Sequence, residues 1–263
     1  MYRSFTAADY RKHFGLPTDY SIDGILCAGS IYSHEENGQL KAGLKAINRP
    51  YTLHQIAVTG KNNQDFLRFI KELHIGNKKL WYFCIYGGAL LSEYLHFGYL
   101  FGAKKTILVG MCGGLNQQAN VGDIIIPDKA HSDGSTAHMY DREHQELQPS
   151  DKSLSAELEK VCQAHGLNVH RGKTMTCQAM IAETWEDVQT WSKAGYLGVE
   201  MEAATVFAVS SHFEKPAAAI LSVADNLIKQ ETNLHEKYHA AEEHRLEVKQ
   251  AQYQIAIKIL LND

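Results

Sequence analysis

The stretch Gly198-Val-Glu-Met-Glu-Ala-Ala204 and the later run Ala217-Ala-Ala-Ile-Leu-Ser-Val-Ala-Asp-Asn226 decide how this chain folds. The first stretch starts as a short apolar strand and ends in two acids, Glu200 and Glu202. Apolar residues at helical spacing follow it, and the second run reads as a buried strand that ends at Asp225. Carboxylates at the carboxyl ends of buried parallel strands lie where open α/β sheets bind ligands. A plainer interpretation, that Glu200 and Glu202 only open a helix, stays open because acids favour the helix dipole there.

Strand-like and helix-like segments alternate along the rest of the chain. Strands are expected at residues 24–28, 53–58, 79–86, 106–109, 122–127 and 168–176, and helices at residues 63–73, 88–101, 151–164, 184–194 and 239–261. This alternation predicts an α/β fold with a mixed, largely parallel central sheet covered by helices on both faces. We find no internal repeat, low-complexity segment or linker, so residues 1–263 are expected to form a single domain.

Composition excludes several classes of function. A net charge of −4 gives no reason to expect a nucleic acid or an acidic membrane as a partner. No apolar run approaches the ~20 residues that span a bilayer, and the first residues lack the apolar core of a signal peptide. The five cysteines have no paired spacing, which favours reduced thiols in a cytoplasmic protein.

Two glycine-rich stretches follow expected strands. At Gly87-Gly88 and at Gly110-Met-Cys-Gly-Gly114, where the chain is expected to turn sharply, exposed backbone N–H groups could hold a phosphate or a ribose hydroxyl. Neither matches a dinucleotide or P-loop pattern, and tight turns alone also explain such glycines. The fourteen histidines include no ligand-spaced set, so no metal site and no bound cofactor are expected.

Four ordered segments together resemble the purine nucleoside phosphorylase and nucleosidase family, of the nucleoside phosphorylase-I type. They are the block from Gly87-Gly88 to Thr106-Ile-Leu-Val-Gly-Met-Cys-Gly-Gly-Leu115, the strand Val121-Gly-Asp-Ile-Ile-Ile-Pro127, the segment Asp133-Gly-Ser-Thr-Ala-His-Met-Tyr140, and Gly198-Val-Glu-Met-Glu-Ala-Ala204 with Ser222-Val-Ala-Asp225. The resemblance implies cleavage of the N-glycosidic bond of a nucleoside or nucleotide. It also implies the family's α/β fold and a homo-oligomer built from dimers, with a hexamer as one form.

The resemblance also implies roles for single residues. Glu202 matches the glutamate that hydrogen-bonds ribose hydroxyls, Met201 the methionine against the sugar, and Glu200 a second glutamate of several members. Asp225 matches the aspartate that gives or shares a proton at purine N7. Gly113 and Met111 lie in the second glycine-rich stretch, which the family places at its substrate, and both are candidates for substrate binding.

The base side of the site favours a purine. Met180 and Ile181 fall where the family places an apolar wall against the base. Uridine-cleaving members carry a Gln and an Arg after that wall, whereas this chain has Thr184 and Glu186 at about those positions. Such members also generally lack the acid that Asp225 supplies.

The nucleophile side departs from the pattern of the phosphorylases. They carry an Arg before, and a Ser or Thr after, the Val-Gly of the second glycine turn, where this chain has Leu108 and Met111. A phosphate dianion would be poorly compensated there. Hydrolytic members use water and a carboxylate of the first turn, which favours hydrolysis here, as in short bacterial AMP nucleosidases. The candidates on this side are Gly29, Ser30, His34 and Glu35, with Glu36 as an alternative.

Other interpretations stay open. A phosphorylase with inorganic phosphate as co-substrate is the first alternative, and a catalytically weak nucleoside-binding protein is the second. A Rossmann-like methyltransferase would not explain Glu200-Met-Glu202 together with Asp225, and a plain structural domain predicts no site at all. His138 and Tyr140 are candidates for contacts to the ribose or its 5′ end, although solvated loop positions explain them equally.

Overall fold

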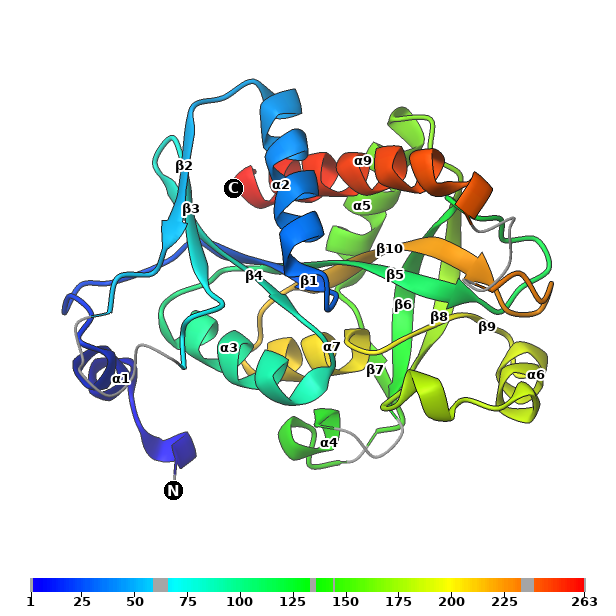
Figure 1. The fold of residues 1–263 in the computed structure, drawn as a ribbon. Helices are drawn as coiled ribbons and strands as arrows, with labels where there is room; N and C mark the ends of the chain where they lie inside the picture. Colours follow the sequence, from blue (N-terminus) through cyan, green and yellow to red (C-terminus); the bar gives the residue numbers. More distant parts are fainter. Residues whose placement is uncertain (1, 59–65, 133–135, 144, 233–238, 263) are drawn as a thin grey trace.

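Ten strands join in one sheet in the part of the chain that the computed structural model describes, residues 2–58, 66–132, 136–143, 145–232 and 239–262 (Figure 1). Starting from the outer edge, they are β2 (Tyr51–Gln55), β3 (Lys71–Ile75), β4 (Lys78–Ile85), β1 (Gly24–Gly29), β5 (Thr106–Gly114), β9 (Tyr196–Glu200), β8 (Val169–Thr176), β6 (Ile124–Ser132) and β10 (Ala217–Asn226), with β7 (Leu147–Pro149) beside β6.

Strand β10 closes part of this sheet into a ring, because it pairs with both β6 and β5. Its pairing with β5 is parallel and extends from Ala217 opposite Thr106 to Asn226 opposite Gly114. The pairings of β1 with β4 and β5, and of β8 with β6 and β9, are also parallel. The pairings β2–β3, β3–β4, β6–β7, β6–β10 and β5–β9 are antiparallel. The expected mixed α/β sheet is therefore confirmed, with parallel and antiparallel pairs side by side at its centre.

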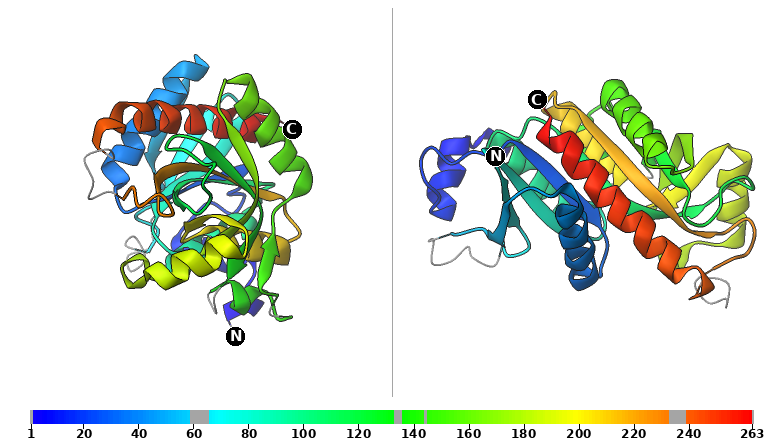
Figure 2. Two further views of the ribbon diagram at one scale, coloured as in Figure 1. Left: turned by 90° about the vertical axis from the view of Figure 1, so that its right-hand side faces the viewer. Right: turned by 90° about the horizontal axis from the view of Figure 1, so that it is seen from above.

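Helices cover both faces of the sheet (Figure 1). On one face lie α2 (Ser33–Ile47), α5 (Lys152–Ala164) and α9 (Glu242–Leu261), with α9 between the other two, as Figure 2 shows from above. On the other face lie α1 (Ala7–Phe14), α3 (Gly88–Leu100), α4 (Ala137–Tyr140) and α7 (Ala203–His212). Helix α6 (Trp185–Lys193) packs against β9, and two short 3₁₀ turns complete the elements, η1 (Tyr2–Ser4) and η2 (Met180–Ala182).

The core forms two apolar layers because the central strands are buried on both faces. In β1, Ile25 and Cys27 belong to the layer under α3 and α7, while Leu26 and Ala28 belong to the layer under α2 and α9. Side chains alternate across a strand, so a strand covered on both sides must be apolar at every position. This explains the continuous apolar runs in the sequence and places the polar ends of the strands at the rim.

Two expectations about local structure are wrong. The helix expected at residues 63–73 is contradicted where the structure describes it, since residues 66–69 form turns and β3 begins at Lys71; residues 63–65 lie outside the described part. Residues 110–114 do not turn out of the sheet but continue β5, because they pair with β10 on one side and, at Gly113 and Gly114, with β9 on the other. Within the described residues, no helix has the length and apolar character needed to cross a bilayer.

Candidate active site

The carboxylate of Glu202 is buried between the ends of two parallel strands. Its Oε1 atom accepts a hydrogen bond of 2.7 Å from the backbone N–H of Gly87, which follows β4. Its Oε2 atom lies so close to Gly29, at the end of β1, that a Cβ placed there would be 2.4 Å away. Gly87 has φ of 79°, in the left-handed region that favours glycine, so this residue type lets the turn present its N–H group.

Burial raises the pKa of Glu202 to about 8, and the negative charge of Glu200 adds to this effect. The side chain therefore holds a proton at neutral pH when no other group compensates its charge. A carboxyl group in this state can both donate and accept a hydrogen bond. This suits a partner such as a sugar hydroxyl, which also does both.

Glu200 has a different position, because both of its oxygen atoms are already engaged. Thr176 Oγ1 donates to Oε1, and the backbone N–H groups of Glu202 and Ala203 donate to Oε2 at 2.7 and 2.6 Å. Burial raises the pKa of Glu200, while these hydrogen bonds act in the opposite direction. Glu200 therefore fits the plainer interpretation, since it holds the start of α7 and so fixes the backbone of Glu202.

The register of three strands places Asp225 level with Val199, which precedes Glu200 and Glu202. Gly113 of β5 is paired with Val199 of β9 on one side and with Asp225 of β10 on the other. The register of β10 shifts between Val223 and Asp225, and an irregularity of this kind, such as a β-bulge, changes the direction of side chains at a strand end. Only strand β5, at Gly113, therefore separates the half-buried Asp225 from Val199 and the segment that follows it.

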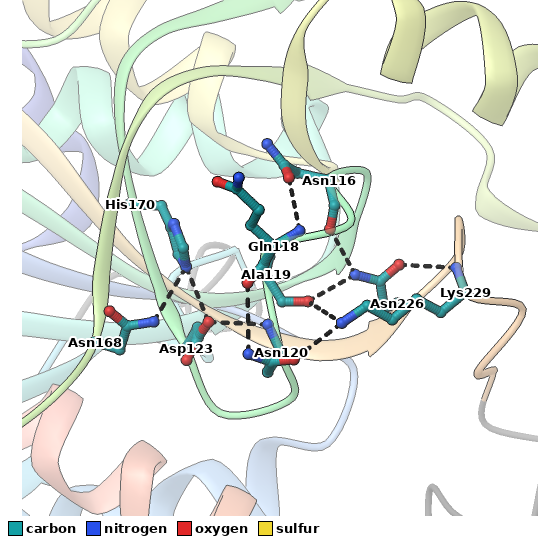
Figure 3. Close-up of polar contacts among 9 residues, drawn as sticks. All are labelled: Asn116, Gln118, Ala119, Asn120, Asp123, Asn168, His170, Asn226 and Lys229. Atoms are coloured by element: carbon teal, nitrogen blue, oxygen red, sulfur yellow. Dashed lines mark hydrogen bonds and ion pairs between the residues drawn. The ribbon is translucent and has the colours of Figure 1, made fainter.

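Asn226, which follows Asp225, anchors the end of β10 to the loop after β5 (Figure 3). Its fully buried Nδ2 atom donates hydrogen bonds of 2.8 Å to the backbone oxygens of Asn116 and Ala119. Its Oδ1 atom accepts a 3.0 Å bond from the backbone N–H of Lys229. This amide uses the donors and acceptors that a buried side chain must satisfy, and it thereby fixes the strand from which Asp225 projects.

The expected base wall lies on η2 and is open to solvent in a single chain. Met180 is 49% exposed and Ile181 is 91% exposed. Next to η2, burial raises the pKa of Glu183, and the charge of Asp225 raises it further. Glu183 was not among the expected site residues, and only its nearness to Asp225 in the fold indicates that it belongs to the base side.

Met111 lies half-buried on the nucleophile side, next to a pair of buried charges from two helices. Lys249 of α9 lies with its Nζ atom 3.8 Å from the sulfur of Met111 and forms an ion pair with Glu36 of α2. The second oxygen of Glu36 accepts a 2.6 Å hydrogen bond from the hydroxyl of Tyr253. Glu36 is therefore the first-turn acid that points inward, whereas His34 and Glu35 are exposed.

Ser30 and Cys84 lie at the ends of β1 and β4. Ser30 is buried, its Oγ atom accepts from the backbone N–H of Tyr32, and its backbone oxygen accepts from the thiol of Cys84 at 3.1 Å. Burial raises the pKa of Cys84 to about 12, and the charges of Glu36, Lys249 and Glu202 all act on it. The pKa of Cys84 thus depends on Glu202 as well as on the buried pair.

The remaining candidates have mixed positions. Met201 is half-buried between Glu200 and Glu202. Tyr140 of α4 makes a 3.2 Å hydrogen bond with His96 of α3, so helix–helix packing already uses its hydroxyl. His138 lies on the same short helix, and residues 133–135 of the motif before it lie outside the described residues.

Tyr86 was missed in the sequence. It is half-exposed beside Gly87; burial raises its pKa, and the charges of Glu202, Cys177 and Glu183 raise it further. Only its position after β4, next to a glycine turn, could have indicated it.

Comparison with known proteins assigns the family. A family model described as "Phosphorylase superfamily" matches residues 88–259, which is more than half of the chain. The chain belongs to the phosphorylase superfamily. It is 30% identical over 143 residues to the purine nucleoside phosphorylase DeoD-type of Pasteurella multocida, a match covering 54% of this chain and 57% of that protein. It is 29% identical over 148 residues to the purine nucleoside phosphorylase DeoD-type 2 of Vibrio vulnificus, covering 56% and 60%. The chain thus spans less than two thirds of these curated relatives.

Family membership confirms the resemblance seen in the sequence and the α/β fold it implied. Two features characterise the nucleophile side of this member of the phosphorylase superfamily. Leu108 is fully buried in the apolar core, and the cation beside Met111 is Lys249, from a helix far along the chain.

Proposed function

We propose that this chain cleaves the N-glycosidic bond of a purine nucleoside or nucleotide. One observation carries the proposal: Gly113 is paired with Val199 on one side and Asp225 on the other, so that Asp225 lies level with the segment leading to Glu202, across one strand. Two carboxyl groups in different environments are what a reaction needs when one part of the substrate gains positive charge and another gains negative charge.

The two acids then have separate tasks. Cleavage gives the ribose oxocarbenium character, and this developing positive charge compensates the charge of Glu202 and favours its ionised form. The ionised Glu202 then accepts hydrogen bonds from the ribose hydroxyl groups and stabilises the positive charge. The electron pair of the broken bond moves into the purine, and a proton from Asp225 at N7 neutralises it. Met201 lies against the sugar in this arrangement, and Gly113 lets the substrate approach β5. Glu183 and the exposed wall of Met180 and Ile181 surround the base.

Hydrolysis is the form of the reaction that the nucleophile side supports best. Leu108 and Met111 offer no charge and no hydroxyl group. Lys249, the cation beside Met111, is neutralised by Glu36 in a buried pair. A phosphate dianion placed here would have to compete with an internal carboxylate for that cation, whereas a water molecule needs no counter-charge.

Phosphorolysis is the second candidate, because the relatives from Pasteurella multocida and Vibrio vulnificus bear the name purine nucleoside phosphorylase. Under this alternative, inorganic phosphate is the co-substrate, and Lys249 would leave Glu36 to meet it. The presence of one lysine next to Met111 is the observation in its favour.

The deciding experiment is incubation with adenosine, inosine, AMP and methylthioadenosine, each with and without phosphate. Release of free base together with free sugar, independent of phosphate, supports the nucleosidase proposal. Release that requires phosphate and yields a sugar 1-phosphate replaces it with the phosphorylase. Binding of these compounds without release of base would contradict both and favour a nucleoside-binding protein.

The assembly is also a proposal. Ile181 and Met180 are exposed apolar side chains beside the proposed base site, and a second copy of the chain would cover such groups. We therefore expect a homo-oligomer built from dimers. A size measurement that finds an active monomer would contradict this. The cytoplasmic location likewise rests on the cysteine spacing alone.

A further inference from the structure

Three side chains that the proposed reaction does not use meet on the outer hairpin formed by β2 and β3. The antiparallel register places His54 directly opposite Glu72. Side chains alternate along a strand, so His74 lies on the same face as Glu72, two residues further along β3. The metal-binding atoms of these three residues all lie within 4.8 Å of one another.

We propose that His54, Glu72 and His74 bind a divalent transition-metal ion of the Zn²⁺ class. The two imidazole Nε2 atoms lie 3.1 Å (His54) and 3.5 Å (His74) from the same carboxylate atom, Glu72 Oε2. A tetrahedral Zn²⁺ ion with bonds of about 2.0–2.1 Å holds its ligand atoms about 3.3 Å apart. The two separations from Glu72 Oε2 lie on either side of this value, and the third, between the ligand atoms of the histidines, is at most 4.8 Å, so an ion fits once the two imidazoles adjust to it.

The carboxylate is oriented by a buried relay of hydrogen bonds. Trp81 Nε1 donates a 2.8 Å bond to the hydroxyl oxygen of Tyr20, and that hydroxyl donates to Glu72 Oε1. Glu72 is itself buried, at 7% exposure. The relay occupies one oxygen and leaves Oε2 directed at both histidines, which is how outer partners orient the carboxylate ligands of metals.

Simple ion pairing explains the arrangement less well. The His54 and His74 rings lie 5.1 Å apart and nearly parallel, so two protonated imidazoles would repel each other across a single carboxylate. The Nε2 atom of His74 is shielded from solvent and makes no hydrogen bond within the described structure. Neutral imidazoles that direct two lone pairs at one cation remove both difficulties. Half-exposed His54 leaves room for water as a fourth ligand.

We expected no metal site because histidines along the sequence have no ligand spacing. That expectation considered only distances along the chain. His54 and Glu72 are separated by 18 residues, and only the pairing of β2 with β3 brings them together. The signal available was Glu72-Leu-His74, two ligand types on one face of a strand.

The test uses the full chain stripped of metal with a chelator and then titrated with Zn²⁺ and, separately, with Co²⁺. We expect one ion bound per chain, a rise in Tm on binding, and an intense visible Co²⁺ spectrum of tetrahedral type. His54→Ala and His74→Ala should each weaken binding at least about tenfold, and the double variant should abolish it. Tyr20→Phe should weaken binding by roughly 10–100-fold, because it leaves the ligands in place but removes the orienting bond.

His170→Ala is the matched control, because His170 also pairs with a carboxylate, that of Asp123 at 2.9 Å, on another part of the sheet. The affinity of the His170→Ala variant for Zn²⁺ should equal that of the unchanged protein. The proposal is overturned if the stripped protein binds no Zn²⁺. It is also overturned if the His54→Ala/His74→Ala variant, folded by circular dichroism, binds Zn²⁺ as tightly as the unchanged protein.

Discussion

The carboxylate of Glu202 packs directly against Gly29, and a side chain at Gly29 would collide with it, since a Cβ there would be 2.4 Å from Glu202 Oε2. The contact joins the end of β1 to the start of α7, two segments far apart in the sequence. It explains in steric terms why glycine stands at the end of this strand. It also makes the position of Glu202 testable without changing Glu202 itself.

Gly29→Ala should lower turnover by about 10–150-fold while the protein stays folded. The added methyl group displaces Glu202 from its place, and a lost charge-assisted hydrogen bond to the substrate corresponds to about 1.5–3 kcal/mol. Base release under saturating substrate measures the effect. Gly38→Ala in α2 is the control, because a Cβ there meets no atom within 4 Å. Equal activity of the two variants would show that Glu202 does not need this space.

Glu202→Gln should keep the fold and lose most turnover. Glutamine retains the shape of the side chain and an oxygen that accepts from Gly87, but it cannot carry negative charge. The loss should again reflect about 1.5–3 kcal/mol, because ribose hydroxyl groups then bond to a neutral acceptor. Steady-state rates of base release, with circular dichroism for the fold, check this. Full activity in a folded Glu202→Gln protein would remove Glu202 from the site.

The stability of the protein should fall as pH rises from about 4.5 to about 8, in part because of Glu202. Its pKa is about 8 in the folded protein, against an ordinary value of 4.5. Between these values the folded state keeps a proton that the unfolded state has released, so raising the pH favours unfolding, by at most about 1.4 kcal/mol per pH unit. Urea unfolding at several pH values measures the slope.

Glu202→Gln is the control for this slope, since glutamine does not titrate. The variant should lose stability less steeply over the same pH range, with the remaining slope due to groups such as Glu200, whose pKa burial also raises. Identical slopes for the two proteins would contradict the raised pKa of Glu202.

The ion pair of Glu36 with Lys249 should behave as a coupled unit. Glu36→Gln or Lys249→Met alone leaves one buried charge without its partner, which destabilises a protein by about 3–5 kcal/mol. The double variant should recover most of that loss, because neither charge is then buried. Urea unfolding of the four proteins gives the coupling. If the two single losses simply add, the charges do not stabilise each other.

The central part of the fold could be predicted because its signals are local. Buried strands β9 and β10 and helix α7 follow from apolar runs and their spacing, and Glu200, Glu202 and Asp225 stand at their ends. Strand β3 could not be predicted in this way, because Leu67, Ile70 and Leu73 also fit helical spacing. Only the pairing of β3 with β2 and β4 decides between a helix and a strand.

Contacts between distant segments explain the rest of what the sequence could not reveal. Lys249 and Met111 are 138 residues apart, and no local pattern connects them. For the same reason the sequence could not show that Glu36, rather than His34 or Glu35, is the first-turn side chain that points inward. In α2, Glu36 lies on the same helix face as the buried Leu40, Gly43 and Leu44, so the spacing predicts that it points inward once a helix is assumed there.

Asp225→Asn tests whether the base is a purine that leaves with a proton. Asparagine keeps the shape of the side chain and its hydrogen-bonding atoms but cannot act as an acid. General acid catalysis typically contributes roughly 10²–10⁴-fold, so turnover should fall on that scale. Substrate binding should change much less, because the proton matters mainly as the bond breaks. Rates and binding constants for adenosine or inosine separate the two effects.

The same variant contains its own control in the choice of leaving group. The nitrophenolate group of a nitrophenyl riboside leaves without needing a proton. The Asp225→Asn variant should therefore cleave this substrate at a rate close to that of the unchanged protein. The defect should therefore be large for ordinary purine nucleosides and small for this activated substrate. If Asp225 only stabilises the end of β10, asparagine would replace it readily, since both residues accept backbone N–H bonds. Near-normal cleavage of purine nucleosides by Asp225→Asn would therefore exclude the acid role proposed for it.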